Sequence, residues 1–284
     1  MTVAGAALGR PPPAPADAGL EARAELRFER DADGRTTLVH QYCEYPHHVV
    51  KPLYLDPERP DLPTLCLQSV SGGLFAGDRL SLYVEIGEAA RVRLVTQAAT
   101  KIHRSDGDLA ATRVDLRVAA SGCVEYAADP LILFPDARAA SSTRVRLAPG
   151  ARAVVREAFL HHAPEDAAPG LFRLFESELI VSDADGEQRA VDRQRIADPQ
   201  RRPELRETLR RFPAQGAVYA LGAPFDGGFV GDLRAAVAPL DAWAGASLLP
   251  NGCGAYLRVL APDGHALRTA LDAAAEAAFQ RGVK

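Results

Sequence analysis

Apolar and polar residues alternate with a period of two over several short stretches of the chain. Residues 21–29, EARAELRFE, place alanine, leucine and phenylalanine on one face and arginine and glutamate on the other. The same alternation recurs over residues 79–86, 113–118 and 144–147. Successive side chains of an extended chain point to opposite faces, so these stretches are predicted to be half-buried strands. We expect a largely antiparallel or coiled β architecture.

A weak internal repeat joins these strands in pairs. Each unit consists of a strand, a tight turn of small residues and another strand, with turn centres near Ala89, Gly122 and Gly150. The period of about 30 residues suggests stacked β layers, each burying its apolar face on the next. The three units are VEIGEAARVRLV (84–95), LRVAASGCVEYA (116–127) and VRLAPGARAVVR (145–156).

Helical periodicity is confined to the last third of the chain. Residues 203–212 are predicted to form one helix, and Asp232 is predicted to cap a second one that ends near Val237. From Asp263 as a cap, a third helix with one apolar stripe runs to the C-terminus; the stripe is Leu267, Leu271, Ala274 and Ala278. The predicted fold is therefore mainly β, a helical or stacked arrangement of strands with a few peripheral helices.

The N-terminal residues 1–20 are rich in alanine and proline and are predicted to form a disordered tail. No linker interrupts residues 21–284, which we expect to form a single domain. A run of 18 apolar residues does not occur, so no membrane span is expected.

Charge and cysteine content narrow the functional classes. The formal net charge is −4, whereas nucleic-acid binders carry a basic surplus, so nucleic acid is not an expected partner. The four cysteines are far apart and form no CxxC pair, which indicates reduced thiols in a cytoplasmic protein.

The loop SVSGGLFAGDR, residues 69–79, has the glycine spacing of a phosphate-binding loop in Gly72 and Gly77. Asp78, however, stands where such a loop has lysine, and a strand pattern follows where a helix N-terminus is needed. We therefore expect a structural connection and no nucleotide site.

Histidine pairs are the weak candidates for metal binding. Adjacent residues on a strand face opposite ways, so each pair can offer only one ligand to a site shared with another element. Ordinary exposed or core histidines are the commoner case. The candidates are Cys43, His47, His48, His161 and His162.

Two motifs in order carry a family resemblance. A glycine-glycine-x-x-x-glycine-aspartate loop is followed by a T-x-x-x-T-K stretch, and DPLILFPDAR (129–138) and LPNGCGAYLRVLAPDGHALRTAL come later. This order resembles the urease accessory protein UreD (UreH) family over about residues 22–280. The motif residues are Gly72, Gly73, Gly77, Asp78, Thr96, Gln97, Thr100 and Lys101, and we expect them to be structural or to face a partner.

The resemblance implies a helical β fold and a cytoplasmic maturation factor without enzymatic activity. Such proteins bind apo-urease and, with UreF and the GTPase UreG, help to install nickel in urease. A tightly bound cofactor is not implied, but transient nickel is. The alternative is a β-rich hydrolase or carbohydrate-active enzyme, which needs paired carboxylates in a cleft. The acidic residues are predicted to alternate outward on the strands, which disfavours this alternative.

Overall fold

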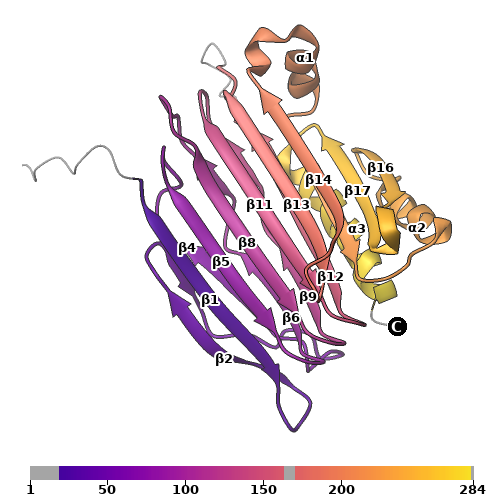
Figure 1. Cartoon of the computed structure of the whole chain (residues 1–284). Helices are drawn as coiled ribbons and strands as arrows, with labels where there is room; N and C mark the ends of the chain where they lie inside the picture. Colours follow the sequence, from indigo (N-terminus) through magenta and orange to yellow (C-terminus); the bar gives the residue numbers. More distant parts are fainter. Residues whose placement is uncertain (1–18, 163–169, 283–284) are drawn as a thin grey trace, which may run out of the picture.

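Two β-sheets face one another, and the chain passes from one to the other many times (Figure 1). This computed structural model describes residues 19–162 and 170–282. The predicted N-terminal tail lies outside the described residues except for Gly19 and Leu20, which lead directly into the first strand.

The first sheet, sheet A, is parallel in its centre and antiparallel at both edges. Its described strands are β1 (Glu21–Arg30), β2 (Thr36–Cys43), β5 (Arg79–Ile86), β8 (Ala110–Val118), β11 (Arg138–Leu147), β13 (Leu174–Asp183) and β14 (Gln188–Ala197). They lie in the order β14-β13-β11-β8-β5-β1-β2. Only β2 and β14 are antiparallel to their neighbours.

The second sheet, sheet B, has the order β16-β17-β15-β12-β9-β6-β4-β3, with β10 and β7 paired beside β12. The described strands are β3 (His47–Val49), β4 (Thr64–Ser69), β6 (Arg91–Thr96), β7 (Thr100–Ile102), β9 (Cys123–Ala127), β10 (Leu131–Leu133), β12 (Arg152–His161), β15 (Ala214–Leu221), β16 (Trp243–Leu248) and β17 (Gly254–Ala261). Strands β4, β6, β9 and β12 are parallel, and the C-terminal strands add on antiparallel.

The three sequence units form successive coils, each with one strand in each sheet. The predicted period is confirmed by the register, which places Ile86 beside Val118 and Val118 beside Leu147. Backbone hydrogen bonds join neighbouring turns, for example from the Ala89 N–H to the Ala120 oxygen at 3.0 Å. The stacked layers expected from the repeat are thus present. The strands that stack on one another are parallel, so the expectation of a coiled architecture holds and that of a largely antiparallel one does not.

One turn centre lies one residue before the glycine near which it was predicted. The left-handed residues of the turns are Ala89 (φ 52°), Ser121 (φ 57°) and Gly150 (φ 73°), so Ser121 takes the place expected of Gly122. Gly122 is instead needed for close packing, because a Cβ there would lie 3.0 Å from the backbone oxygens of Ala119 and Gly87. Gly122 is therefore needed because there is no room for a side chain, and not because of its backbone conformation.

Apolar side chains fill the space between the sheets near the tight turns. The alternation expected from the sequence is confirmed, because the apolar residues of β1 and β5 face this core and the charged ones face outward. Beside it, β7 and β10 continue an inward row of Leu74, Ile102, Leu133 and His161, which lie side by side in register. The row ends in a histidine where the preceding coils have leucine or isoleucine.

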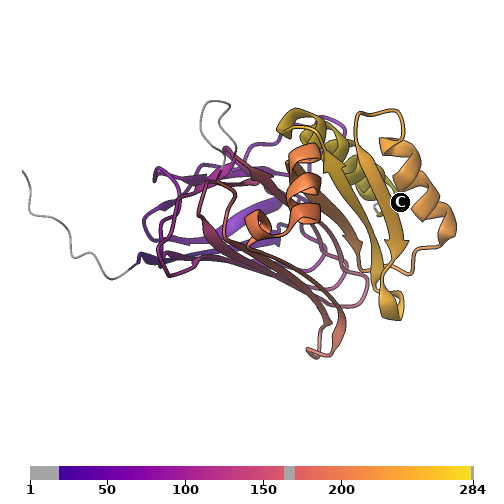
Figure 2. The ribbon, with the colours of Figure 1, turned by 90° about the horizontal axis from the view of Figure 1, so that it is seen from above.

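Three helices lie against this scaffold: α1 (Pro203–Arg211), α2 (Gly227–Val237) and α3 (Gly264–Gly282), with short 3-10 turns at Pro199–Arg201 and Pro250–Gly252. Figure 2 shows α2 and α3 together beside the C-terminal strands and α1 apart from them. The predicted apolar stripe of α3 is buried against sheet B. In the part of the chain that the structure describes, no helix is long and apolar enough to cross a membrane.

The start of α2 differs from the prediction. The helix begins after Asp226, whose side chain accepts a hydrogen bond from the Phe229 N–H at 2.9 Å, and Asp232 lies inside it. Three glycines make this segment a poor intrinsic helix former. Burial of Phe229 and Val230 against the α3 side of sheet B overrides that propensity.

Candidate functional site

A cavity of about 790 Å³ lies between the two sheets, toward the N-terminal ends of β5, β8 and β11. On sheet A its wall is a row of polar side chains, which the register places side by side across four strands. The row is Thr112, Ser141, Ser177 and Gln194, and the Thr112 hydroxyl donates a hydrogen bond to Ser141 Oγ at 3.3 Å. Hydroxyl and amide groups therefore replace the apolar rows found nearer the turns.

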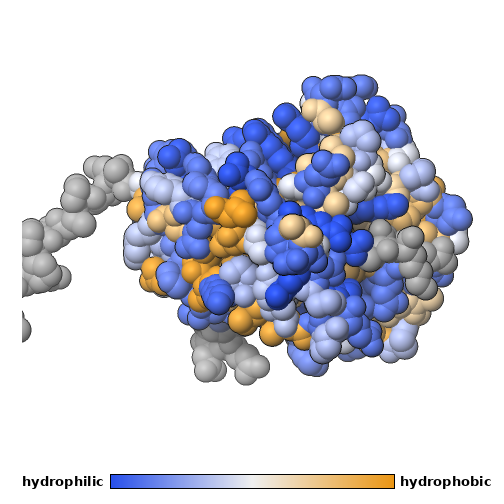
Figure 3. All heavy atoms as spheres, turned by 90° about the horizontal axis from the view of Figure 1, so that it is seen from below, coloured by the Kyte–Doolittle hydropathy of each residue, from blue (hydrophilic) through white to orange (hydrophobic). Residues whose placement is uncertain are grey.

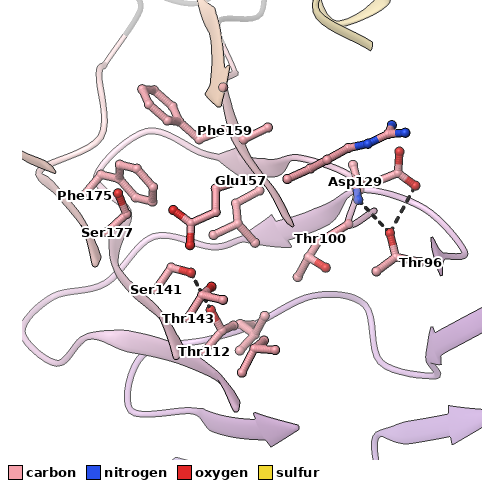
Figure 4. Close-up of a pocket in the computed structure, with 18 of the residues that line it drawn as sticks. Thr96, Thr100, Thr112, Asp129, Ser141, Thr143, Glu157, Phe159, Phe175 and Ser177 are labelled. Carbon is pink, nitrogen blue, oxygen red and sulfur yellow. Dashed lines mark hydrogen bonds between the residues drawn. The ribbon is translucent and has the colours of Figure 1, made fainter. Parts of the chain in front are cut away.

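Glu157 faces this row from β12 of sheet B (Figure 4). Its Oε1 atom is buried and has no hydrogen-bond partner. Burial is the largest effect and raises the pKa of Glu157 to about 7. The nearby Asp192 also raises this pKa, whereas Thr143 and Arg258 lower it. The carboxyl group is therefore poised between its neutral and charged forms near neutral pH.

A polar contact between the sheets closes one side of the cavity. The Tyr219 hydroxyl donates to Asp192 Oδ2 at 2.7 Å, and Arg258 donates to the same oxygen at 2.5 Å. Burial is the largest cause that raises the pKa of Tyr219, so its hydroxyl stays protonated. These contacts fix the separation of β14 from β15 and β17 at this position.

Six of the eight family-motif residues line the cavity although they come from two separate segments of the chain: Gly72, Gly73, Thr96, Gln97, Thr100 and Lys101. The Leu74 N–H donates to the Lys101 oxygen at 2.8 Å, which brings the two segments together. Thr96 donates to Asp129 Oδ2 at 3.1 Å and accepts from the Asp129 N–H at 2.8 Å. The two motifs thus form one wall.

The remaining motif residues, Gly77 and Asp78, belong to the structural part of the loop. Asp78 is buried, and its two oxygens accept hydrogen bonds of 2.8 Å from the backbone N–H groups of Leu20 and Phe75. The loop then enters β5, a strand. This carboxylate organises the backbone around itself, which is opposite to the arrangement that would hold a phosphate.

The structure separates the five weak metal candidates. His47 lines the cavity, and its Nε2 atom is buried without a partner. Exposed His48 hydrogen bonds to Gln68, buried His161 ends the inward row described above, and Cys43 packs against the core between the sheets. His162 points the other way, and its ring lies 4.4 Å from that of Phe134.

Burial dominates the electrostatics of these histidines. It lowers the pKa of His161 to about 4, with a smaller contribution from His162, and it also lowers the pKa of His47. Across residues 19–162 and 170–282, no group of three or more His, Cys, Asp and Glu side chains gathers in metal-binding geometry. The cavity offers a cation the Glu157 carboxylate and the hydroxyl oxygens that face it, and basic side chains such as Arg156 and Arg258 also line the cavity.

Glu157 was not predicted as a site residue, because the acidic residues of the strands were expected to face outward. That expectation is wrong for Glu157 and Asp192, which face the interior. A signal existed in the third repeat unit and its continuation: Glu157 has the same parity as buried Ala153, Val155 and Phe159. A charged residue at an apolar-phase position marks an interior polar site.

The enzyme alternative requires two carboxylates that share one substrate position. The carboxylates among the described lining residues are Glu157 and Asp129. Asp129 is held by Thr96 and by Arg268, which donates to its Oδ1 at 2.5 Å. Figure 4 shows its carboxylate turned toward Thr96 and away from Glu157. This arrangement does not favour a glycosidase-like pair.

Comparison with known proteins gives one consistent family. The family model described as UreD urease accessory protein matches residues 20–283. The chain is 38% identical over 275 residues to urease accessory protein UreD 1 of Methylorubrum extorquens (strain PA1), covering 94% of this chain and 92% of the relative. It is 39% identical over 243 residues to UreD 3 of Bradyrhizobium sp. (strain ORS 278), covering 86% and 85%. It is 34% identical over 257 residues to UreD of Haloarcula marismortui (strain ATCC 43049), covering 90% and 85%.

Proposed function

Because the chain belongs to the UreD family of urease accessory proteins, we propose that it is a urease maturation factor without catalytic activity of its own. In this proposal it binds apo-urease in the cytoplasm and acts with UreF and the GTPase UreG while nickel is inserted. The nucleotide is bound by UreG, in keeping with the structural loop at Asp78.

The observation that carries a nickel role is the unpartnered carboxylate oxygen of Glu157 in a cavity walled by the two family motifs. Nickel(II) accepts carboxylate, hydroxyl, imidazole and water ligands. The donors here are Glu157, the hydroxyls facing it and, elsewhere in the cavity, His47. One free carboxylate in a cavity that basic side chains also line suits brief residence of nickel and its release better than storage.

Exposed apolar side chains support the proposal that this chain acts in a complex with other proteins. Most of the large exposed apolar and aromatic residues fall between residues 39 and 75: Val39, Tyr42, Tyr45, Leu53, Tyr54, Leu55, Val70 and Phe75. Figure 3 shows hydrophobic atoms gathered on the left half of the lower face, whereas the right half is mostly hydrophilic. Exposed apolar patches of this kind are more typical of protein interaction sites than of the surface of a protein that works as an isolated monomer.

The proposal is tested by activating urease in cells that carry the urease and accessory genes with and without this chain. We expect nickel per urease active site and urease activity to fall together when the chain is absent. Glu157→Gln keeps the shape and removes the charge, and we expect it to lower both quantities at equal levels of soluble protein.

Glu88→Gln is the matched control, because Glu88 is exposed on a tight turn. Normal activation without the chain would refute the maturation role. Full activation by Glu157→Gln would leave the maturation role intact and remove the cavity from the nickel route.

A further inference from the structure

Helix α1 and the turn before it carry a dense group of arginines. Residues 199–212 read PQRRPELRETLRRF, and the five arginines are all exposed: Arg201, Arg202, Arg206, Arg210 and Arg211. Only Glu204 and Glu207 offset them within the segment. The whole chain has a net charge of −4, so this segment is a local reversal of sign.

These arginines differ from those of the preceding strand in their partners. On β14, Arg193 pairs with Glu178 and Arg195 with Glu176. Within residues 19–162 and 170–282, no carboxylate forms an ion pair with the arginines of the α1 segment. Unpaired guanidinium groups on one short helix leave a positive field that a complementary surface can neutralise.

An exposed aromatic group extends this surface. The Phe212 and Trp243 rings lie 5.4 Å apart, and the Arg211 guanidinium lies 4.9 Å from the Trp243 ring centre. Trp243 is 60% exposed although it starts the edge strand β16. Arginine and tryptophan are among the residues enriched at the positions that contribute most of the binding free energy in protein–protein interfaces.

The helix also lies at one end of the interior cavity. Leu205 and Thr208 line the cavity, and Leu209 is fully buried and anchors the helix. The basic face of α1 is therefore presented beside the cavity, on the side opposite to its apolar anchor.

We propose that α1 and Trp243 form a docking surface for an acidic surface of a partner protein. The combination of an exposed tryptophan with arginines favours a protein partner over a nucleic acid, because the net negative charge of this chain would repel a nucleic acid. An acidic patch also attracts divalent cations, so docking beside the cavity would bring donor or acceptor groups for metal close to it. This last step and the choice of partner proteins for the test rest on the proposed function.

The test measures binding of the full chain to two purified probes, urease apoprotein and UreF, by biolayer interferometry at low and high salt. We expect the double variant Arg206→Glu/Arg210→Glu to weaken binding to one probe by about tenfold or more and to remove most of its salt dependence. Trp243→Ala should weaken binding to the same probe. The fold should tolerate this change because the Trp243 side chain is exposed. The double variant Arg144→Glu/Arg146→Glu, with the same charge change on the exposed face of sheet A, is the matched control and should bind normally.

Unchanged binding of the α1 and Trp243 variants, with wild-type chain binding a probe, would overturn this inference and leave the proposed function standing. Wild-type chain that binds neither probe would overturn both. The same variants are also tested against double-stranded DNA and against anionic phosphatidylserine vesicles. Loss of binding to one of these, with binding to both protein probes unchanged, would assign the basic helix to another class of partner and overturn the inference. Melting temperatures of all variants separate loss of binding from loss of folding.

Discussion

The Leu20 backbone N–H donates a hydrogen bond of 2.8 Å to Oδ1 of Asp78, 58 positions further along the chain. The Arg79 N–H in turn donates to the Leu20 oxygen at 2.7 Å. Asp78 thus fastens the start of β1 to the loop that begins β5, and the parallel pairing of these strands follows. The motif aspartate acts here as a structural acceptor.

Removal of this carboxylate should destabilise the fold. Asp78→Ala leaves two backbone N–H groups without their acceptor, and we expect a loss of about 2–3 kcal/mol in the free energy of unfolding. Asp78→Asn keeps one acceptor oxygen and should lose less. Chemical denaturation gives the values, with Asp183→Ala as the control, because Asp183 accepts two backbone N–H groups in an exposed hairpin. An equal effect of the two alanine variants would contradict the structural role.

The three motif glycines should respond differently to alanine. Gly73 has φ 134°, and a Cβ there would lie 2.5 Å from the Lys101 oxygen, so we expect Gly73→Ala to cost about 2 kcal/mol or more. Gly77 has φ 84° and a nearest contact of 3.2 Å to Gly19, so about 1 kcal/mol is expected. Gly72 has nothing within 4 Å of its missing Cβ and serves as the neutral control. Thermal melting ranks the variants, and a costly Gly72→Ala would refute this ordering.

Stability should fall in mild acid because of His161. The unfolded chain binds a proton near pH 6.5, whereas burial lowers the folded pKa to about 4, so the unfolded state gains protons first as the pH falls. The stabilisation is complete above about pH 6.5 and is lost progressively toward pH 4, by at most about 3 kcal/mol. His161→Leu should flatten this part of the stability curve, since leucine continues the row of Leu74, Ile102 and Leu133. Exposed His265→Gln is the control, and an unchanged slope in His161→Leu would exclude His161 as the cause.

Among the candidate histidines, His47 alone lines the cavity, so His47→Ala should affect nickel delivery most. We expect lower urease activation at an unchanged level of soluble protein. The reason is that the Nε2 atom of His47 is buried at the cavity wall without a protein partner and is therefore free to bind nickel. His48→Ala and His162→Ala should activate urease normally. Equal activation by all three variants would remove the imidazoles from the route.

Nickel should bind the isolated chain weakly. One free carboxylate with hydroxyl donors, in a cavity that basic side chains also line, predicts micromolar or weaker affinity in calorimetry and no metal retained through gel filtration. Loss of a residue that only hydrogen bonds to a metal ligand commonly weakens metal binding by about tenfold. We therefore expect Glu157→Gln to weaken nickel binding by about tenfold or more. Glu88→Gln should leave it unchanged. Nanomolar binding, or equal binding by both variants, would contradict the role given to Glu157.

Local patterns predicted the main strands, the repeat and the C-terminal helix of this fold. Strand alternation, the turn-centred repeat of about 30 residues and the apolar stripe of α3 are properties of neighbouring residues, so the mainly β, stacked architecture could be expected from them. The failure of the glycine loop as a phosphate site was also local, because Asp78 and the strand after it exclude one. The cap of α2 was missed because burial of Phe229 outweighs the poor helix propensity of the glycines around it.

The tertiary structure alone decided the site. The inward orientation of Glu157 depends on the register of β12 between β9 and β15, and that register is set by contacts between coils far apart in sequence. The same stacking brings the loop at Gly73 against Lys101. It also packs Cys43 against the core between the sheets and places His161 beside Leu133. The sequence names these residues, but their distances follow from which parallel strands pair, and pairing is determined by packing of whole coils that no local pattern encodes.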